Sequence, residues 1–322
     1  VRPAKDRVNL IAKFLEEYHD ESGIIYCLSR KSTESLAQKL ADRGFNTAYY
    51  HARMPHEERS RVQDAFLKDD IQIVCATVAF GMGIDKSNVR FVLHYNLPKN
   101  IESYYQEIGR AGRDGLPSKA VLFYTYSDVM QQQRMLEEEE STIKDIKLSK
   151  LERLKQYAES AICRRKILLN YFNENLNENC NNCDVCHNPR ETFDATVIAQ
   201  KVLSAVARMK QKSPTGIVVD VLRGNANYKV REHGYDRIKT FGAGRDVSPF
   251  NWKLYINQLV NIGLLEVAYD ENNALKLTEA SKKILFDGQS VELTRLQAKT
   301  FKKETTTDTT STRKPSRHRD LS

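Results

Sequence analysis

The sequence predicts an α/β domain with a parallel sheet covered by helices on both faces, followed by a cysteine-rich helical module and a small domain of three helices and a hairpin. Three observations in the 322 residues favour this arrangement. Helical and apolar strand-like segments alternate up to about residue 127, four closely spaced cysteines follow, and helical segments precede two short strands between about 192 and 290. The alternation is typical of a parallel sheet with helices on its two faces.

The α/β part contains five apolar segments with the character of strands and three amphipathic segments with the character of helices. The predicted strands are rich in β-branched and aromatic residues and lie at 23–28, 46–50, 71–78, 89–96 and 120–126. The predicted helices lie at 6–18, 33–44 and 57–69. Cys27 and Cys75 occur inside predicted strands, where cysteine serves as a small hydrophobic core residue.

Two arginines, Arg110 and Arg113, each follow a glycine just beyond a helical-looking run. Upstream, the stretch from Cys75 to Lys86 leaves a predicted strand through two glycines, into the kind of loop where α/β proteins bind ligands. We expect both arginines near this loop, on the same edge of the sheet. Because a guanidinium donates several hydrogen bonds and keeps its charge, they are candidate phosphate ligands, although either one taken singly is typical of a surface ion pair.

Four further cysteines form a pattern typical of a metal site. Cys180, Cys183 and Cys186 are spaced by two residues each in an Asn-rich loop, and Cys163 lies upstream. Four thiolates complete a closed tetrahedral zinc site, which is our prediction. A disulfide, an iron–sulfur cluster and a mixed site in which His187 replaces one thiolate are the alternatives.

The apolar spacing from 148 to 172 predicts one long amphipathic helix. This helix would contain Cys163 and lead to the loop that holds the other three cysteines. In the last domain the third helix has clear start and stop signals, with Ser248 as N-cap, Pro249 at the first helical position and Gly263 just past the end. The hairpin is predicted over 264–277. Trp252 lies at helical spacing with apolar neighbours and is predicted to pack in the core.

The net charge of +8 is concentrated in one region. Residues 201–253 hold eleven Lys or Arg and four Asp or Glu, a balance that favours binding of nucleic acid over a merely solvated basic face. No apolar run reaches the roughly 18 residues of a membrane span, and no signal-peptide pattern starts the chain. We therefore expect no membrane partner and a cytoplasmic location, associated with the nucleoid if the source is bacterial.

Three blocks of the α/β part resemble motifs IV, V and VI of superfamily 2 helicases. They read SGIIYCLSRKSTESLA, ATVAFGMGIDKSNVRFVLH and ESYYQEIGRAGRDG, and in this wording they are similar to the RecQ family of DNA helicases. The similarity continues with CRRKILLNYF and CNNCDVC, which resemble the RecQ zinc-binding segment, and with GRDVSPFNWKLYINQLVNIGLL, which resembles its winged-helix domain. The resemblance covers roughly residues 5 to 290.

The resemblance implies a domain organisation. A second RecA-like helicase domain would occupy 1–128, a helical linker with the four-cysteine zinc module 129–191, and a winged-helix domain 192–290. Residues 291–322 are predicted to be a disordered tail, because from about 303 they lack large apolar residues before Leu321.

The resemblance also implies catalytic roles for motif VI. Arg113 would be the arginine finger that stabilises charge on the transferred γ-phosphoryl group, and Arg110 would contact phosphate beside it. Gln106 would link the nucleotide to the DNA site. In motif V, Gly83 and Asp85 would line the path from the nucleotide cleft to the DNA backbone.

The implied DNA contacts come from two domains. Thr77 in motif V and Ser29 and Arg30 in motif IV would hold the strand, and the basic residues around the Ser248 helix would contact duplex phosphates; these are Lys239, Arg245 and Lys253. The hairpin turn YDENN is short and acidic, which predicts that it does not separate strands. One departure from the family pattern is Arg53, which stands where a glycine is common.

The sequence has no Gly-Lys dipeptide and hence no G-x-x-x-x-G-K-[ST] phosphate loop, so we expect the first RecA-like domain to lie outside it. The resemblance implies the C-terminal part of an ATP-dependent DNA helicase that moves 3' to 5', with one structural Zn²⁺ and with ATP and Mg²⁺ in the complete enzyme. Expected partners are single-stranded and duplex DNA and the missing domain, with single-stranded-DNA-binding protein as a further candidate. A non-catalytic zinc and winged-helix DNA-binding protein and an RNA helicase of the same superfamily are the alternatives.

Overall fold

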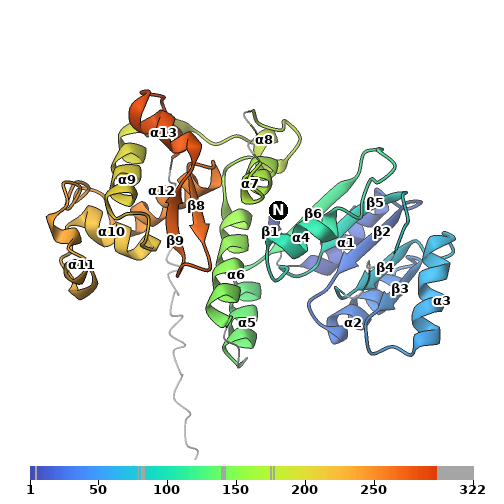
Figure 1. Ribbon diagram of the computed structural model, residues 1–322. Coiled ribbons are helices and arrows are strands. Elements are labelled where there is room, and N and C mark those ends of the chain that lie inside the picture. The colour runs from blue at the N-terminus through green and yellow to red at the C-terminus, as the bar shows by residue number, and fades with distance from the viewer. Residues whose placement is uncertain are drawn as a thin grey trace, which may run out of the picture.

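The computed structural model describes residues 1–3, 6–78, 80, 84–138, 143–174, 176 and 178–295. It places the α/β domain on one side, the winged-helix domain on the other and a helical module between them (Figure 1). None of the described helices is both long and apolar enough to cross a membrane.

The α/β domain is built on a six-stranded sheet in which every neighbouring pair is parallel, as the alternation predicts. Its strands are β1 (Arg2–Pro3), β2 (Ser22–Tyr26), β3 (Thr47–Tyr50), β4 (Ile73–Ala76), β5 (Val89–His94) and β6 (Lys119–Tyr124), in the order β1-β6-β5-β2-β4-β3. The central strands β2, β4 and β5 are buried along their whole length, which explains their continuous apolar sequences.

Helices cover both faces of this sheet. Consecutive strand residues point to opposite faces, so each buried strand contributes apolar side chains to a core on either side. Ile25 packs with α1 (Arg7–Glu16) and α2 (Arg30–Ala41) on one face. Ile24 packs with α3 (His56–Leu67) on the other face, together with Phe80 from the loop after β4. Cys27 and Cys75 lie in the first of these cores, as predicted.

The helical module consists of α5 (Tyr126–Glu137), α6 (Lys144–Glu159), α7 (Arg164–Tyr171) and the short α8 (Asp184–His187). The single helix predicted over 148–172 is wrong, because α6 and α7 are separate. Ser160 and Cys163 have extended ψ values of 148° and 124°, so the backbone leaves the helical conformation between them. The break places Cys163 at the N-cap of α7, beside Cys180 in the loop that holds the other three cysteines.

The third domain is the predicted set of three helices and a hairpin with shorter additions. It contains α9 (Thr196–Arg208), α10 (Thr215–Arg223), α11 (Tyr228–Glu232), a 3₁₀ turn η1 (Tyr235–Arg237), α12 (Pro249–Asn261), β8 (Leu265–Ala268), β9 (Ala274–Leu277) and α13 (Glu279–Phe286). Ser248 caps α12 as predicted, with its hydroxyl accepting from the Asn251 amide at 3.1 Å. Trp252 is fully buried and donates from Nε1 to the Gly244 carbonyl at 2.9 Å, which confirms its core position.

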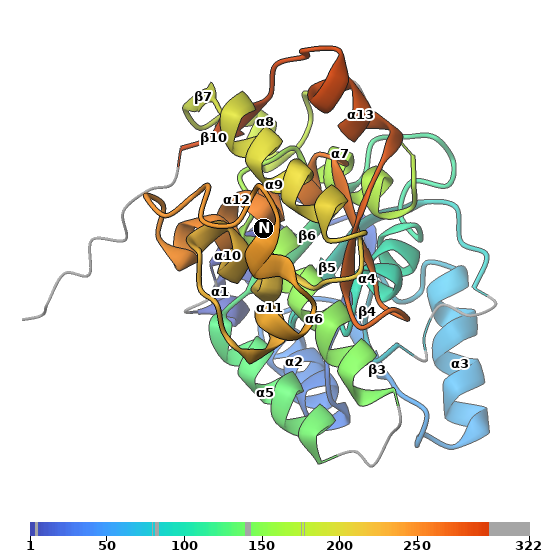
Figure 2. The ribbon, with the colours of Figure 1, turned by 60° about the vertical axis from the view of Figure 1, so that its left-hand side comes forward.

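The boundary of the predicted tail at residue 291 is wrong. Residues 292–294 form strand β10 (Glu292–Thr294), antiparallel to β7 (Thr192–Asp194), and Figure 2 shows the two strands together beside α9. Val291 and Leu293 are buried in the winged-helix core. This segment therefore belongs to the folded domain and pairs with the first strand of that domain. Residues 296–322 of the predicted tail lie outside the described part of the chain.

One buried residue, Asn261 at the end of α12, joins the winged helix to the helical module. Its carbonyl accepts from Asn170 Nδ2 at 2.9 Å, its own Nδ2 donates to Ser160 Oγ at 3.3 Å, and its Oδ1 accepts from Arg153 Nη1. Arg153 is itself buried, and this burial lowers the pKa of its guanidinium. We call these four residues the Asn261 junction.

Candidate functional site

The loop after β4 is the first component of the candidate phosphate site. Because β4 and β5 are parallel and separated by β2 in the sheet, this connection has to travel from the carboxyl end of β4 back to the amino end of β5. It crosses the face that α3 covers, where Phe80 and Ile84 are buried. Tyr26 fixes its first part by donating a hydrogen bond to the Phe80 carbonyl at 3.0 Å.

The segment after α4 (Ile101–Ile108) carries the two predicted arginines, and Arg113 contacts the end of this loop. Asn100 caps α4, and the chain then turns so that the Gly112 amide donates to the Val89 carbonyl at 2.9 Å. Gly112 has a φ of +70°, and a Cβ there would lie 2.7 Å from Ser118 Oγ, so the turn requires glycine. Asp114 pairs with the buried Arg90 at 2.6 Å, and this hydrogen bond lowers the pKa of the Asp114 carboxyl.

Arg113 lies beside the loop, as predicted, but not on the predicted edge of the sheet. Its Nη1 is 3.4 Å from the Ile84 carbonyl and 3.5 Å from Asp85 Oδ1, and its Nε is 3.4 Å from the Gly109 carbonyl. The expectation that it would lie at the carboxyl edge is wrong, because the loop carries the site toward the amino end of β5. These long contacts and a side chain 36% exposed leave the guanidinium accessible.

The remaining predicted residues of the α/β domain fall into two groups. Gln106 and Asp85 are exposed near the arginines, whereas Gly83 lies outside the described residues. Ser29 and Thr77 follow the adjacent parallel strands β2 and β4, so they lie at the carboxyl edge of the sheet with the exposed Arg30. Ser29 also has a structural role, since its hydroxyl caps α2 by accepting from the Ser32 amide at 3.1 Å.

Two functional candidates near motif VI were not predicted. His94 ends β5, and its Nε2 is 2.7 Å from Oε2 of Glu107 on α4; both residues are buried. The only sequence signal is position: Glu107 lies three residues after Tyr104, so the two side chains share the buried face of α4. Nothing in the apolar pattern of β5 distinguishes His94 from an ordinary core histidine.

The four predicted cysteines converge as a metal site requires. The Sγ atoms of Cys163, Cys180, Cys183 and Cys186 all lie within 4.8 Å of one another, and no disulfide joins any of them. Two of the separations are 3.4 and 3.9 Å, close to the ~3.8 Å expected between sulfurs bound at about 2.3 Å to one tetrahedral zinc.

The surroundings of the cysteine cluster also fit zinc. The amides of Cys180 and Arg164 donate to Cys163 Sγ and Cys183 Sγ at 3.3 and 3.4 Å, and such hydrogen bonds stabilise thiolates. Without a cation, burial and the neighbouring thiols raise the pKa of Cys186 to about 12, and a bound cation would lower it again. His187 is outside the group of ligand atoms, which disfavours the mixed site.

The predicted DNA-binding residues of the third domain are exposed around the start of α12. Lys239 and Arg245 precede the helix and Lys253 lies in its second turn. Arg245 rests against Gly224 and Gly242, where an added Cβ would lie 2.7 Å from its Nε in each case. Two strongly exposed aromatic side chains of this domain were not predicted, Tyr228 on α11 and Phe250 in the first turn of α12.

The hairpin turn between β8 and β9 is directed at the helical module. Burial raises the pKa of Tyr269, whose neighbours include Arg153 of α6 and Tyr171 of α7. Figure 1 shows the hairpin alongside α6. The three residues that follow Tyr269 in the turn are exposed, and the expectation that the hairpin does not separate strands stays a prediction.

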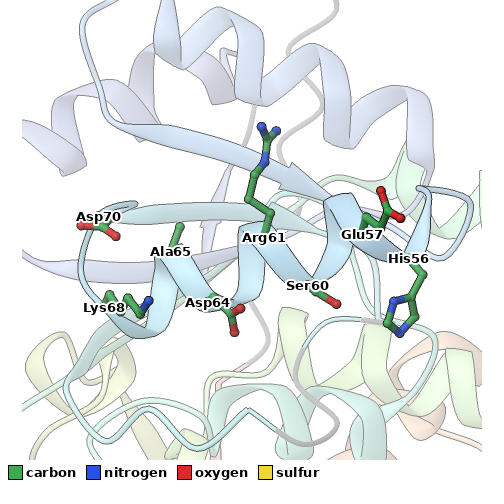
Figure 3. Close-up of a pocket in the computed structure, with 8 residues that line it drawn as sticks. All are labelled: His56, Glu57, Ser60, Arg61, Asp64, Ala65, Lys68 and Asp70. Carbon is green, nitrogen blue, oxygen red and sulfur yellow. The ribbon is translucent and has the colours of Figure 1, made fainter.

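A shallow hollow runs along α3 (Figure 3). Its lining includes His56, Arg61 and Lys68, whose side chains point in different directions from the helix. None of the predicted site residues contributes to it, so we assign it no role.

Comparison with known proteins divides the chain into three matched parts. Residues 6–115 match the helicase conserved C-terminal domain, residues 126–187 the RecQ zinc-binding domain and residues 189–302 the RQC domain. The chain is 44% identical to ATP-dependent DNA helicase RecQ of Pasteurella multocida over 285 residues and 45% identical to that of Haemophilus influenzae, covering 88% of the chain in each case. It is 40% identical to the Bacillus subtilis protein of the same name over 74% of its length. The chain spans about half the length of these curated relatives, between 40% and 46%.

Proposed function

The chain belongs to the RecQ family of helicases, and we propose from this that it forms the part of an ATP-dependent DNA helicase that completes the nucleotide site, binds zinc and contacts DNA. The observation that carries the proposal is the contact of Arg113 with the loop after β4. Through this contact the permanent charge of Arg113, in motif VI, lies against motif V. ATP hydrolysis in the complete enzyme would drive translocation 3' to 5' and separation of duplex DNA.

In this proposal Arg113 acts as the arginine finger and Arg110 as a second phosphate ligand. Gln106, Asp85 and Gly83 would connect the nucleotide to the DNA site, with ATP and Mg²⁺ held mainly by another RecA-like domain. The domains would extend over 1–128, 129–191 and 192 to about 295, the last limit following β10. Ser29, Arg30 and Thr77, which share one edge of the sheet, would contact the strand.

The first test uses the 322-residue chain by itself. We expect it to hydrolyse ATP no faster than buffer, with or without DNA, because its sequence has no phosphate loop to hold the nucleotide. The measurement is phosphate release at saturating ATP, with the complete enzyme as positive control. DNA-stimulated ATP turnover by the chain alone would refute the proposal that another domain holds the nucleotide. An inactive complete enzyme would refute the helicase assignment.

The second test concerns the winged helix. We expect it to bind duplex DNA mainly through phosphates, because its exposed cations surround a helix N-terminus. Arg245→Ala and Lys253→Ala should each weaken binding to all duplex sequences alike and reduce the slope of log K against log salt by about one. Fluorescence anisotropy at several salt concentrations measures both quantities.

A suitable control is Lys282→Ala, since Lys282 is exposed on α13 and pairs with Glu279 at 2.7 Å. It should leave affinity and slope nearly unchanged. A change in DNA sequence preference in either the Arg245→Ala or the Lys253→Ala variant, or no effect of both substitutions, would contradict phosphate docking.

The same basic residues are the support for two finer proposals, binding of single-stranded-DNA-binding protein and, in a bacterial cell, association with the nucleoid.

A further inference from the structure

A buried polar pair joins the end of β5 to the last turn of α4, one helical turn before Arg110. His94 is 1% exposed and Glu107 7% exposed, and the 2.7 Å contact between His94 Nε2 and Glu107 Oε2 joins the end of β5 to α4. Glu107 is three residues before Arg110, and its carbonyl accepts a hydrogen bond from the Arg110 amide at 3.2 Å. Glu107 and Arg110 thus belong to the same turn of the backbone.

The second ring nitrogen of His94 indicates how the pair is hydrogen-bonded. His94 Nδ1 is buried and has no hydrogen-bond partner among the described residues. A doubly protonated ring would leave an N–H orphaned there, which costs more than an unused lone pair. A ring that donates from Nε2 to the Glu107 carboxylate and leaves Nδ1 as an unused acceptor fits this arrangement.

The side chains around the pair connect it to the arginines. The His94 ring stacks on Tyr26 with centroids 5.5 Å apart and contacts the Tyr104 ring at 5.0 Å. The Tyr26 hydroxyl lies in the field of three charges: after burial, Glu107 raises its pKa, whereas Arg110 and Arg113 lower it. The Tyr26 hydroxyl itself donates to the Phe80 carbonyl, so the ring that stacks on His94 also contacts the loop after β4.

We propose that Glu107, oriented by His94, is a positioning residue for Arg110 and Arg113. Two like charges three residues apart repel each other, and the hydrogen bonds of Arg113 to the loop are long. In this proposal the carboxylate supplies the opposing charge that orients Arg113 over the loop and Arg110 beside it before phosphate arrives. Asp85 cannot replace it, because its side chain is 96% exposed and its field is screened by water.

The experiment uses the complete enzyme and rests on the proposed ATPase function. Glu107→Gln keeps the shape and a hydrogen bond to His94 but removes the charge, and His94→Leu removes the donor. Both should lower kcat for ATP by about tenfold to a hundredfold, the scale of a misplaced catalytic group, while KM for ATP changes by less than about twofold. His94→Gln, whose amide can reproduce the Nε2 donor, should recover kcat to within about threefold of the wild type.

The matched control is Glu34→Gln. Glu34 accepts from a histidine in the same way, with Oε1 2.8 Å from His51 Nε2, but it is half exposed on α2. It should leave kcat unchanged. Thermal unfolding of each variant measures its folded fraction, so that a loss of structure is separated from a loss of positioning.

The outcomes are distinct. An inactive wild-type enzyme refutes the proposed function, whereas an active wild type with an equally active Glu107→Gln variant refutes only the positioning role. A fall in kcat that matches the fall in folded protein, or an equal fall in Glu34→Gln, also overturns it. Failure of His94→Gln to recover activity would show that the ring, and not its Nε2 donor, is what the site requires.

Discussion

Replacing Arg113 with alanine in the complete enzyme is expected to lower kcat for ATP hydrolysis about a thousandfold or more and to leave DNA affinity nearly intact. The reason is that an arginine finger acts mainly on charge that develops in the transition state. In the structure the Arg113 side chain makes only long contacts and is partly exposed, so its removal disturbs little of the fold. Steady-state phosphate release and anisotropy with labelled DNA provide the two measurements.

Arg61→Ala is the control for this experiment. Arg61 is an exposed arginine of the same domain, on α3, and belongs to none of the three helicase motifs. Its removal should change kcat by less than about twofold, the scale expected for a surface substitution. If Arg113→Ala reduced DNA affinity as strongly as kcat, Arg113 would be a strand contact and the finger assignment would be wrong.

Loss of zinc is expected to have the second large effect. The pure chain should contain one zinc, and Cys183→Ser should remove it and unfold the helical module, giving insoluble or protease-sensitive protein. The segment that carries three of the ligands has little other structure, so metal binding contributes folding free energy directly. Elemental analysis and limited proteolysis test both parts of the prediction.

His187→Ala separates a four-cysteine site from a mixed one. His187 is next to Cys186 in the sequence but is not among the converging ligand atoms, so this variant should keep its zinc. Retention of zinc by Cys183→Ser, loss of zinc by His187→Ala, or iron with visible absorption would contradict the assignment.

The sheet and the cysteine site could be predicted because each depends on a local pattern. A strand buried on both faces needs a continuous apolar run, and tetrahedral zinc needs four soft ligands at short spacing. The pattern failed between Ser160 and Cys163, where apolar spacing continues across a break in the helix. The break places the Cys163 sulfur beside the other three, a tertiary arrangement that periodicity does not contain.

Other features were hidden because their partners are distant in sequence. Strand β10 exists because β7, about a hundred residues earlier, offers it an edge to pair with. The position of Arg113 depends on how the loop after β4 crosses the sheet, which follows from strand order and not from residue types. His94 and Glu107 look ordinary in the sequence, and only their burial against each other marks them as unusual.

The Asn261 junction has a mechanical consequence if the complete protein moves along a strand, as proposed above. Three hydrogen bonds that meet at one residue join the winged helix to the helical module at this point. Hydrogen bonds that share one residue are loaded together and break together when the two parts are pulled apart. Under tension the molecule should therefore yield at this joint before either core opens, so that the winged helix is released as an intact unit and can return to its place when the load falls.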